Sequence, residues 1–320
     1  MTNNIVHDVE TGISSDFGNN YNITYSYNTI YNVNWGAAIA SRSINSSMSG
    51  FYLYDNYIHD MENWDDTTGQ NAFHHNGFFG FVYNGGSFSD IYIYNNTVGP
   101  GFGVTNTTGM WLDTTGPGNG TISNGNFYNN LMIIAPGEHG INNALLQGSS
   151  SSNTDFRFLN NTFIGGGTAI GASTGSGGTI TVKNNLMVGS EHGVLFSTKC
   201  GQTDYTASHN LFYNIDPLYP YTCLTPPYNN GSFYSLSEWQ ALTGQDLDVL
   251  TSDPLLDQNY RPQAGSPAIG AGVNLSSLGI ASLNKDRNGV VRPASAAWDI
   301  GAYRDGDTMA PAAPSGLSVK

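Results

Sequence analysis

A recurring asparagine constrains this chain more than any other feature of its sequence. Each copy precedes a short apolar run, as in NNTVGP, NNLMII and NNTFIG. The asparagines in this position are Asn4, Asn28, Asn56, Asn96, Asn130, Asn161, Asn185 and Asn210. Successive copies are 24 to 40 residues apart, and most steps are too short for a propeller blade, which needs roughly forty residues. The spacing therefore predicts a solenoid.

The residues around each asparagine indicate which solenoid this is. An alternating strand such as FYLYD or TITVKN comes before most copies, and a turn with Gly and an aliphatic residue comes after most. We align these last pairs as Gly12-Ile13, Gly103-Val104, Gly140-Ile141 and Gly193-Val194. Short strands repeated at this period are typical of an all-β parallel β-helix, in which equivalent residues stack about 4.8 Å apart. The asparagines are then predicted to form an inward ladder of amides.

Glu-His-Gly occurs twice and resembles a duplicated catalytic motif. We place both copies at one register, before the Gly-aliphatic strand, and therefore interpret Glu138-His139 and Glu191-His192 as bend residues that face solvent. His7-Asp8 and His59-Asp60 likewise share a register after the asparagine. If regular positions build the scaffold, functional residues are expected in the irregular coils.

Composition narrows the class of protein. The chain has 40 Gly and a net charge of −14, from 24 acidic and 10 basic residues. Nucleic-acid binding needs a basic face, so neither a nucleic acid nor an anionic membrane surface is an expected partner. No apolar run approaches transmembrane length, so membrane insertion is not expected. The acidity suits an extracellular protein or one that binds calcium through carboxylates.

The two cysteines and the first residues carry further information. Cys200 and Cys223 favour a disulfide over a zinc site, because no other metal ligands lie at zinc spacing. MTNNIVHDVE lacks the features of a signal peptide and already lies inside a repeat, so we expect a fragment whose start has been removed.

The pattern changes after Tyr234. SLSEWQALTG reads as a short helix with Ser235 as its cap and Glu238 three residues later. The segments that follow resemble the last coils of bacterial secreted right-handed parallel β-helix repeat proteins, in the pectate-lyase-like superfamily. The matching elements are Asp253-Pro254, Gly265 to Ile269, Asp286, Gly289, Arg292-Pro293 and Asp299 to Tyr303. Arg304 departs from the pattern, which usually has an acidic residue there.

The resemblance implies a right-handed, single-stranded β-helix that is secreted or displayed on a bacterial cell surface, as a monomer within a multidomain parent. We expect coils over residues 1–234, final coils and a C-terminal cap over 235–306, and a linker over 307–320. The linker sequence leads towards a fibronectin type III module. The cap should cover the open edge of the last coil, whose unpaired backbone groups would recruit other strands.

The longest step, from Asn56 to Asn96, gathers most of the candidate site residues. Asp60, Glu62 and Asp65 are candidate calcium ligands, because hard cations prefer carboxylate oxygens. Asp66 is a candidate acid or base, and His74 or His75 is a candidate general base.

Neighbouring coils add to this set. The next step contributes Trp111 and Asp113, which is a further candidate acid or base, and the preceding coil contributes Trp35 and Arg42. With Trp64, the tryptophans offer flat faces for sugar rings, and Arg42 is placed to orient a substrate carboxylate. Because coils stack, loops from one corner of adjacent coils should meet in space.

Two functions follow from this reading. Catalytic members of the resembling group mostly cleave polysaccharides. The first hypothesis is therefore a glycan-cleaving enzyme, either a polysaccharide lyase of a uronate-containing glycan or an inverting hydrolase. Ca²⁺ is its candidate cofactor. No complete signature of either enzyme is present. The second hypothesis is a non-catalytic carbohydrate-binding or adhesive spacer, in which the acidic loop is only a solvated surface.

Overall fold

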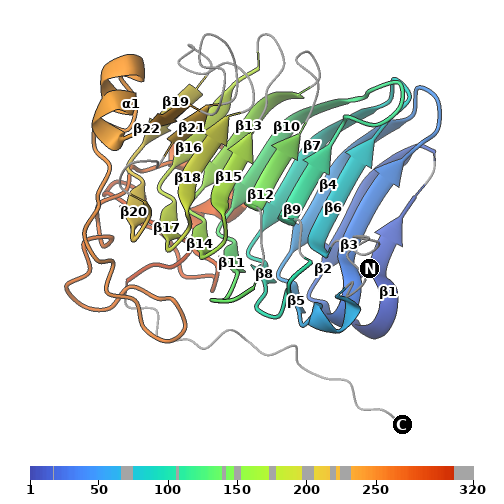
Figure 1. The fold of residues 1–320 in the computed structure, drawn as a ribbon, viewed down its shortest axis with the longest axis horizontal. Coiled ribbons are helices and arrows are strands. Elements are labelled where there is room, and N and C mark those ends of the chain that lie inside the picture. The colour runs from blue at the N-terminus through green and yellow to red at the C-terminus, as the bar shows by residue number, and fades with distance from the viewer. Residues whose placement is uncertain are drawn as a thin grey trace.

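The computed structural model describes residues 1–16, 18–65, 75–105, 108–138, 142–147, 153–172, 178–196, 205–216, 221–223 and 232–305. Their strands stack side by side along the long axis of the molecule, as Figure 1 shows. One sheet contains β2 (Asn20–Ser26), β4 (Ser47–Tyr54), β7 (Ser87–Tyr94), β10 (Thr121–Tyr128), β13 (Asn153–Leu159), β16 (Ile180–Lys183) and β19 (Tyr205–Ser208). All of its pairings are parallel, as predicted for a β-helix.

The second sheet has two branches that meet at the long strands β1 (Ile5–Ser15) and β3 (Thr29–Ser41). The branch of short strands contains β5 (Tyr57–His59), β8 (Thr97–Val98), β11 (Leu131–Ile133), β14 (Thr162–Ile164), β17 (Leu186–Val188) and β20 (Leu211–Tyr213). The other branch contains β6 (Asn76–Val82), β9 (Thr108–Asp113), β12 (Asn142–Gln147), β15 (Thr168–Ala172), β18 (His192–Phe196), β21 (Tyr221–Cys223) and the antiparallel β22 (Ser232–Tyr234). Each coil therefore has three sides, and the parallel β-helix is confirmed.

The predicted asparagine ladder is present at the corner between the first sheet and the short strands. All eight predicted asparagines take part, and each side-chain amide donates to Oδ1 of the next at 2.8 to 3.2 Å. The same Oδ1 also accepts the backbone N–H of the preceding asparagine. The residue before each asparagine is left-handed, with φ of 51° to 57° where it is also Asn, a conformation that Asn tolerates.

One predicted register was wrong. The glycines that stack on one another are Gly12, Gly36, Gly77 and Gly109, because the residues after them pair as Ile13, Ala37, Phe78 and Met110. Gly103-Val104 lies earlier in its coil, where Val104 is exposed; Gly140-Ile141 lies outside the described residues. A longer insertion in that coil moved the Gly-aliphatic pair away from the alignment.

The two Glu-His-Gly copies also lie at different registers. His192 pairs with Thr168, which pairs with Asn142, three residues beyond His139. Glu191 is exposed as expected, but the carboxylate of Glu138 faces the neighbouring backbone. His139 lies outside the described residues. Glu191 is therefore a solvent-facing residue as predicted, whereas Glu138 binds backbone N–H groups of its own coil and of the neighbouring coil.

The end of the bore is closed by the predicted helix. Helix α1 (Leu236–Thr243) begins with a capping box between Ser235 and Glu238, and its buried Trp239 stacks on Tyr221 at 4.6 Å. The ladder ends here too, because Asn210 donates to Oδ1 of Asp246 at 2.9 Å. No helix in the described part of the chain is long and apolar enough to cross a membrane.

Residues 251–305, which we name the C-terminal strap, do not stay at that end. They fold back along the ladder corner, in orange and red in Figure 1. The left-handed asparagines hold them: Asn129 donates to the backbone oxygen of Lys285, and Asn160 donates to that of Asp299, both at 2.8 Å. Arg287 reaches as far back as Thr97. The segment that follows helix α1 therefore forms a lateral strap along the ladder corner.

Two predictions are not reached by the described residues. Cys200 lies outside them and only the backbone of Cys223 is described, so the disulfide stays a prediction. The proposed linker, residues 307–320, lies outside them as well.

Candidate functional site

Strand β6 is apolar on both faces and carries large aromatic side chains on its outer face. Phe78 and Val82 point into the bore and belong to the main core. Phe79 and Phe81, at the alternate positions, belong to a separate cluster on the outer face. An outer face that carries large aromatic side chains needs an explanation other than the scaffold.

The outer cluster spans three successive coils. Phe79 contacts Trp35 from β3 edge-on, with ring centroids 5.3 Å apart, and Trp111 from β9 at 4.7 Å. Phe81 contacts Phe79 and Tyr83, each at 4.9 Å. We name Trp35, Phe79, Phe81, Tyr83 and Trp111 the aromatic platform. Phe79 and Phe81 are buried, whereas both tryptophans and Tyr83 are only half-buried and supply the part of the platform that faces solvent.

Two polar side chains lie at one end of the platform. The exposed Arg42 places its guanidinium 5.1 Å from the centre of the Phe81 ring, a cation–π contact. Asp113 is buried and accepts hydrogen bonds from the Tyr83 hydroxyl at 2.8 Å and from the Thr115 hydroxyl at 2.6 Å. Burial, reinforced by Asp113, raises the pKa of Tyr83, which therefore stays a hydroxyl donor at neutral pH.

The corner beside the platform contains His75. Its Nδ1 lies 3.0 Å from Oδ1 of Asn34, and its Nε2 lies 3.0 Å from Oδ1 of Asp65 and 2.9 Å from Oγ1 of Thr105. The side chain of His75 is completely buried. A general base must come within hydrogen-bond reach of the substrate. In this arrangement both ring nitrogens of His75 face protein groups instead.

Asp65 is a structural clamp in the same corner. Its oxygens accept the backbone N–H groups of Val104 and Thr105 and the Thr105 hydroxyl, all at 3.0 Å. Burial alone would raise the pKa of Asp65, but these hydrogen bonds and the one with His75 lower it below the ordinary value. The carboxylate is therefore ionised and fully used in joining two coils.

The other candidate calcium ligands lie apart from Asp65. Asp60 accepts from Nδ1 of His59 at 2.7 Å, and Glu62 is exposed in the short 3₁₀ helix η1 (Glu62–Trp64). Over the described ranges, no group of three or more His, Cys, Asp or Glu side chains is close enough to hold a metal ion. The three candidate calcium ligands are all described and do not form such a group, and calcium binding stays a prediction.

The predicted residues thus divide into two groups. Trp35, Trp111, Arg42 and Asp113 come together on the platform, as the stacking of coils implied. Asp65 and His75 meet in the adjacent corner, where the indole N–H of Trp64 also donates to the backbone oxygen of Asn32 at 3.0 Å. The candidate acid or base Asp66 and the candidate base His74 lie outside the described residues.

Sequence reasoning missed Phe79, Phe81 and Tyr83. The signal was available in NGFFGFVYN, where apolar residues fill consecutive positions instead of alternate ones. In a strand, that pattern means that both faces are apolar.

Comparisons with known proteins add no family to this picture. The sequence matches no protein-family model, and no curated protein is similar to it.

Proposed function

We propose that this protein binds a polysaccharide along the outer face of β3, β6 and β9, through the aromatic platform. One observation carries the proposal: aromatic side chains from three successive coils meet outside the bore, in a cluster separate from the core. Sugar rings present C–H faces that pack on aromatic rings, and their hydroxyls bind polar groups at the rim. Arg42 supplies a cation for an acidic sugar at that rim.

Two further features support binding as the first function. In the corner, the candidate base His75 and the candidate calcium ligand Asp65 are both engaged with protein groups from three segments. The platform itself is built on strands, which hold side chains more rigidly than loops do. We also propose an extracellular or cell-surface location, since the strap motifs resemble those of secreted β-helix proteins.

Affinity gel electrophoresis with uronate-containing and neutral polysaccharides tests the proposal. The dissociation constant is obtained from the retardation of the protein by polysaccharide in the gel. Trp111→Ala should raise it about tenfold, which corresponds to about 1.4 kcal/mol. Tyr21→Ala is the matched control, because Tyr21 is an exposed aromatic residue on β2 of the other sheet. Equal retardation of the wild type and Trp111→Ala on every polysaccharide tested would rule out the platform.

Glycan cleavage is the second candidate, and the position of Arg42 and Asp113 at one end of the platform favours it. A lyase would release products that absorb through unsaturated uronic ends, whereas an inverting hydrolase would release reducing ends alone. The same substrates are assayed with and without a chelator, since loss of activity on chelation would support calcium. Retardation without any product would leave binding as the function.

A further inference from the structure

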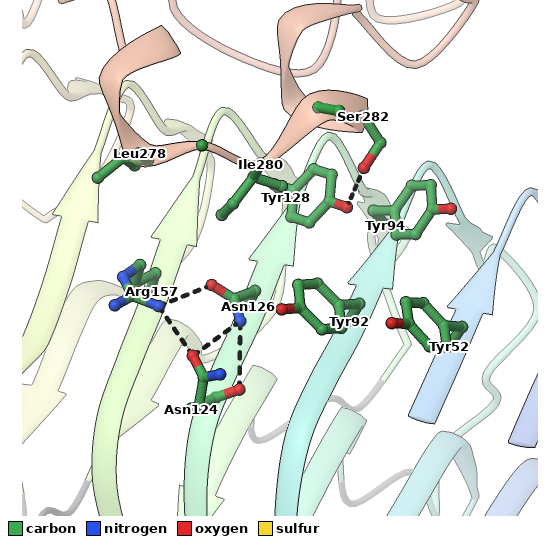
Figure 2. Close-up of a pocket in the computed structure, with 12 residues that line it drawn as sticks. Tyr52, Tyr92, Tyr94, Asn124, Asn126, Tyr128, Arg157, Leu278, Ile280 and Ser282 are labelled. Atoms are coloured by element: carbon green, nitrogen blue, oxygen red, sulfur yellow. Dashed lines mark hydrogen bonds between the residues drawn. The ribbon is translucent and has the colours of Figure 1, made fainter. Parts of the chain in front are cut away.

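A groove lies on the wall of the solenoid away from the platform. It encloses about 420 Å³ between the first sheet and residues Leu278–Ser282 of the C-terminal strap. That volume is within the range of small-molecule sites, which is roughly 300 to 1,000 Å³. Figure 2 shows the strap as one side of the groove and side chains of four neighbouring strands as its floor.

The floor is a row of polar groups set by the strand register. Tyr52 on β4 pairs with Tyr92 on β7, which pairs with Asn126 on β10 and then Arg157 on β13. Tyr52 and Tyr92 stack 5.1 Å apart and nearly parallel, which fixes both rings. Side chains in this row repeat at the inter-strand distance of about 4.8 Å.

Arg157 is held in place by neutral groups. Its Nη1 donates to Oδ1 of Asn124 at 3.0 Å and to Oδ1 of Asn126 at 2.9 Å, as Figure 2 shows. It forms no ion pair with any carboxylate in the described part of the chain. The nearby Asp90 and Asp155 accept from Asn124 and Thr179 instead. In a chain of net charge −14, a cation oriented by two amides is pre-organised for an anion from outside.

The opposite side of the groove is apolar and fixed to the floor. Leu278 and Ile280 line it, and Ile280 packs against the cluster around Tyr128. The Tyr128 hydroxyl lies 2.6 Å from Oγ of Ser282, which ties the strap to the sheet. A ligand in the groove would therefore meet apolar groups on one side and hydroxyl, amide and guanidinium groups on the other.

The pairing of the floor strands argues against a peptide. β4, β7, β10 and β13 each pair on both sides within the sheet. They offer no strand edge to which a peptide backbone could add. On the sheet side of the groove, side chains must therefore make every polar contact, which suits a ligand rich in hydroxyl groups.

We propose that this groove is a second ligand site, and that it binds a saccharide carrying a carboxylate, with Arg157 as the carboxylate's partner. The site goes beyond the proposed function, because none of its residues belongs to the platform. The carboxylate would take the N–H groups of Arg157 that do not face Asn124 and Asn126. The sugar ring would lie between Ile280 and the tyrosine row.

Isothermal titration with a short oligogalacturonide tests the charge requirement, and its fully methyl-esterified form is the matched neutral probe. The acid should bind at least about tenfold more tightly than the ester. Arg157→Gln keeps an amide for Asn124 and Asn126, and should weaken binding of the acid about tenfold while leaving the ester unchanged. Lys183→Gln removes a cation from the same sheet outside the groove, and should change the affinity less than about twofold.

Two substitutions of opposite charge at Leu278 test the same charge requirement from the strap side of the groove. Leu278 is exposed, which limits the loss of packing. Leu278→Asp should weaken binding of the acid about two- to threefold and Leu278→Lys should strengthen it by a similar factor. Trp111→Ala should retain this binding, which separates the groove from the platform.

Four results would overturn the proposal. They are equal affinity for acid and ester, an unchanged affinity in Arg157→Gln, an equal loss in Lys183→Gln, and no binding of the acid at millimolar concentration. Oligoglutamate or inorganic phosphate that binds as tightly as the acid would show that the groove selects an anion and not a saccharide.

Discussion

The two corners that flank the short strands carry out the same task with different residues. At the ladder corner, one residue type recurs in eight coils and every coil uses the same hydrogen bonds. At the opposite corner, each coil is closed separately: Asp65 accepts N–H groups from residues 104 and 105, whereas Glu138 accepts those of Gly101, Phe102 and Ala135. A residue that repeats in every coil therefore indicates a scaffold role, but a residue that does not repeat is not by that fact catalytic or ligand-binding.

That difference matters for reading carboxylates in irregular coils. Asp65 and Glu138 have the residue type of a catalyst or metal ligand, and both instead satisfy backbone donors that no ladder serves. The closing of the coils does not explain the aromatic side chains on the outer face. The following predictions test the comparison, beginning with the largest expected effect.

The ladder should tolerate loss of an amide poorly. Asn130 donates to Asn161 and to the backbone oxygen of Ile93, and its Oδ1 accepts two bonds from Asn96. Asn130→Ala leaves these buried groups unpaired, so the free energy of unfolding should fall by about 4 kcal/mol. Chemical denaturation measures this. The exposed Asn259→Ala is the control, with an expected change below about 0.5 kcal/mol. Similar losses in both variants would mean that the ladder contributes no special stability.

The end of the ladder should make stability depend on pH. Burial raises the pKa of Asp246 to about 6, although hydrogen bonds from Tyr221, Asn210 and Tyr205 oppose the rise. Between about pH 4 and pH 6 the folded state then binds more protons than the unfolded state, so stability should fall as pH rises, by about 3 kcal/mol in all.

Asp246→Asn is uncharged and should remove this dependence. Unfolding curves recorded between pH 4 and pH 7 for both proteins provide the test, because the difference between the variant and the wild type should grow with pH. A constant difference across that range would contradict the raised pKa.

Substitutions at the opposite corner should lower the free energy of unfolding less, because each carboxylate there closes only one coil. Glu138→Ala removes the acceptor for three backbone N–H groups and should cost about 2 kcal/mol, and Glu138→Gln about half as much. Glu191→Ala alters the other Glu-His-Gly copy at an exposed position and should have almost no effect. Thermal unfolding measures all three variants. Equal effects of Glu138→Ala and Glu191→Ala would restore the view that the two copies are equivalent.

Repeated residues outside the core should matter least. His59-Asp60 repeats the contact of His7-Asp8, but half of the Asp60 side chain is exposed. Asp60→Asn keeps a residue that tolerates the left-handed conformation and should cost less than about 1 kcal/mol. A larger loss in denaturation would show that repetition indicates stability even at the surface.

Much of the fold could be predicted from local features. The asparagines, the alternating strands and the capping box of Ser235 are each recognisable within a few residues, because stacking makes every coil obey the same local rule. The predicted register was wrong where a coil is longer. An insertion moves Gly103-Val104 away from the stacked glycines, although the pair still looks like the others in sequence. Half of the platform could be predicted: its tryptophans were identified from the sequence, whereas Phe79, Phe81 and Tyr83 were missed.

The sequence by itself determined that the chain forms stacked coils and where the ladder lies, because both depend on a repeat. Only the tertiary structure decided which carboxylates serve as clamps, which outward side chains meet, and that residues 251–305 return along the wall. The physical reason is that these contacts join residues from different coils or from the distant strap, such as Arg287 with Thr97, and no local pattern records such a distance.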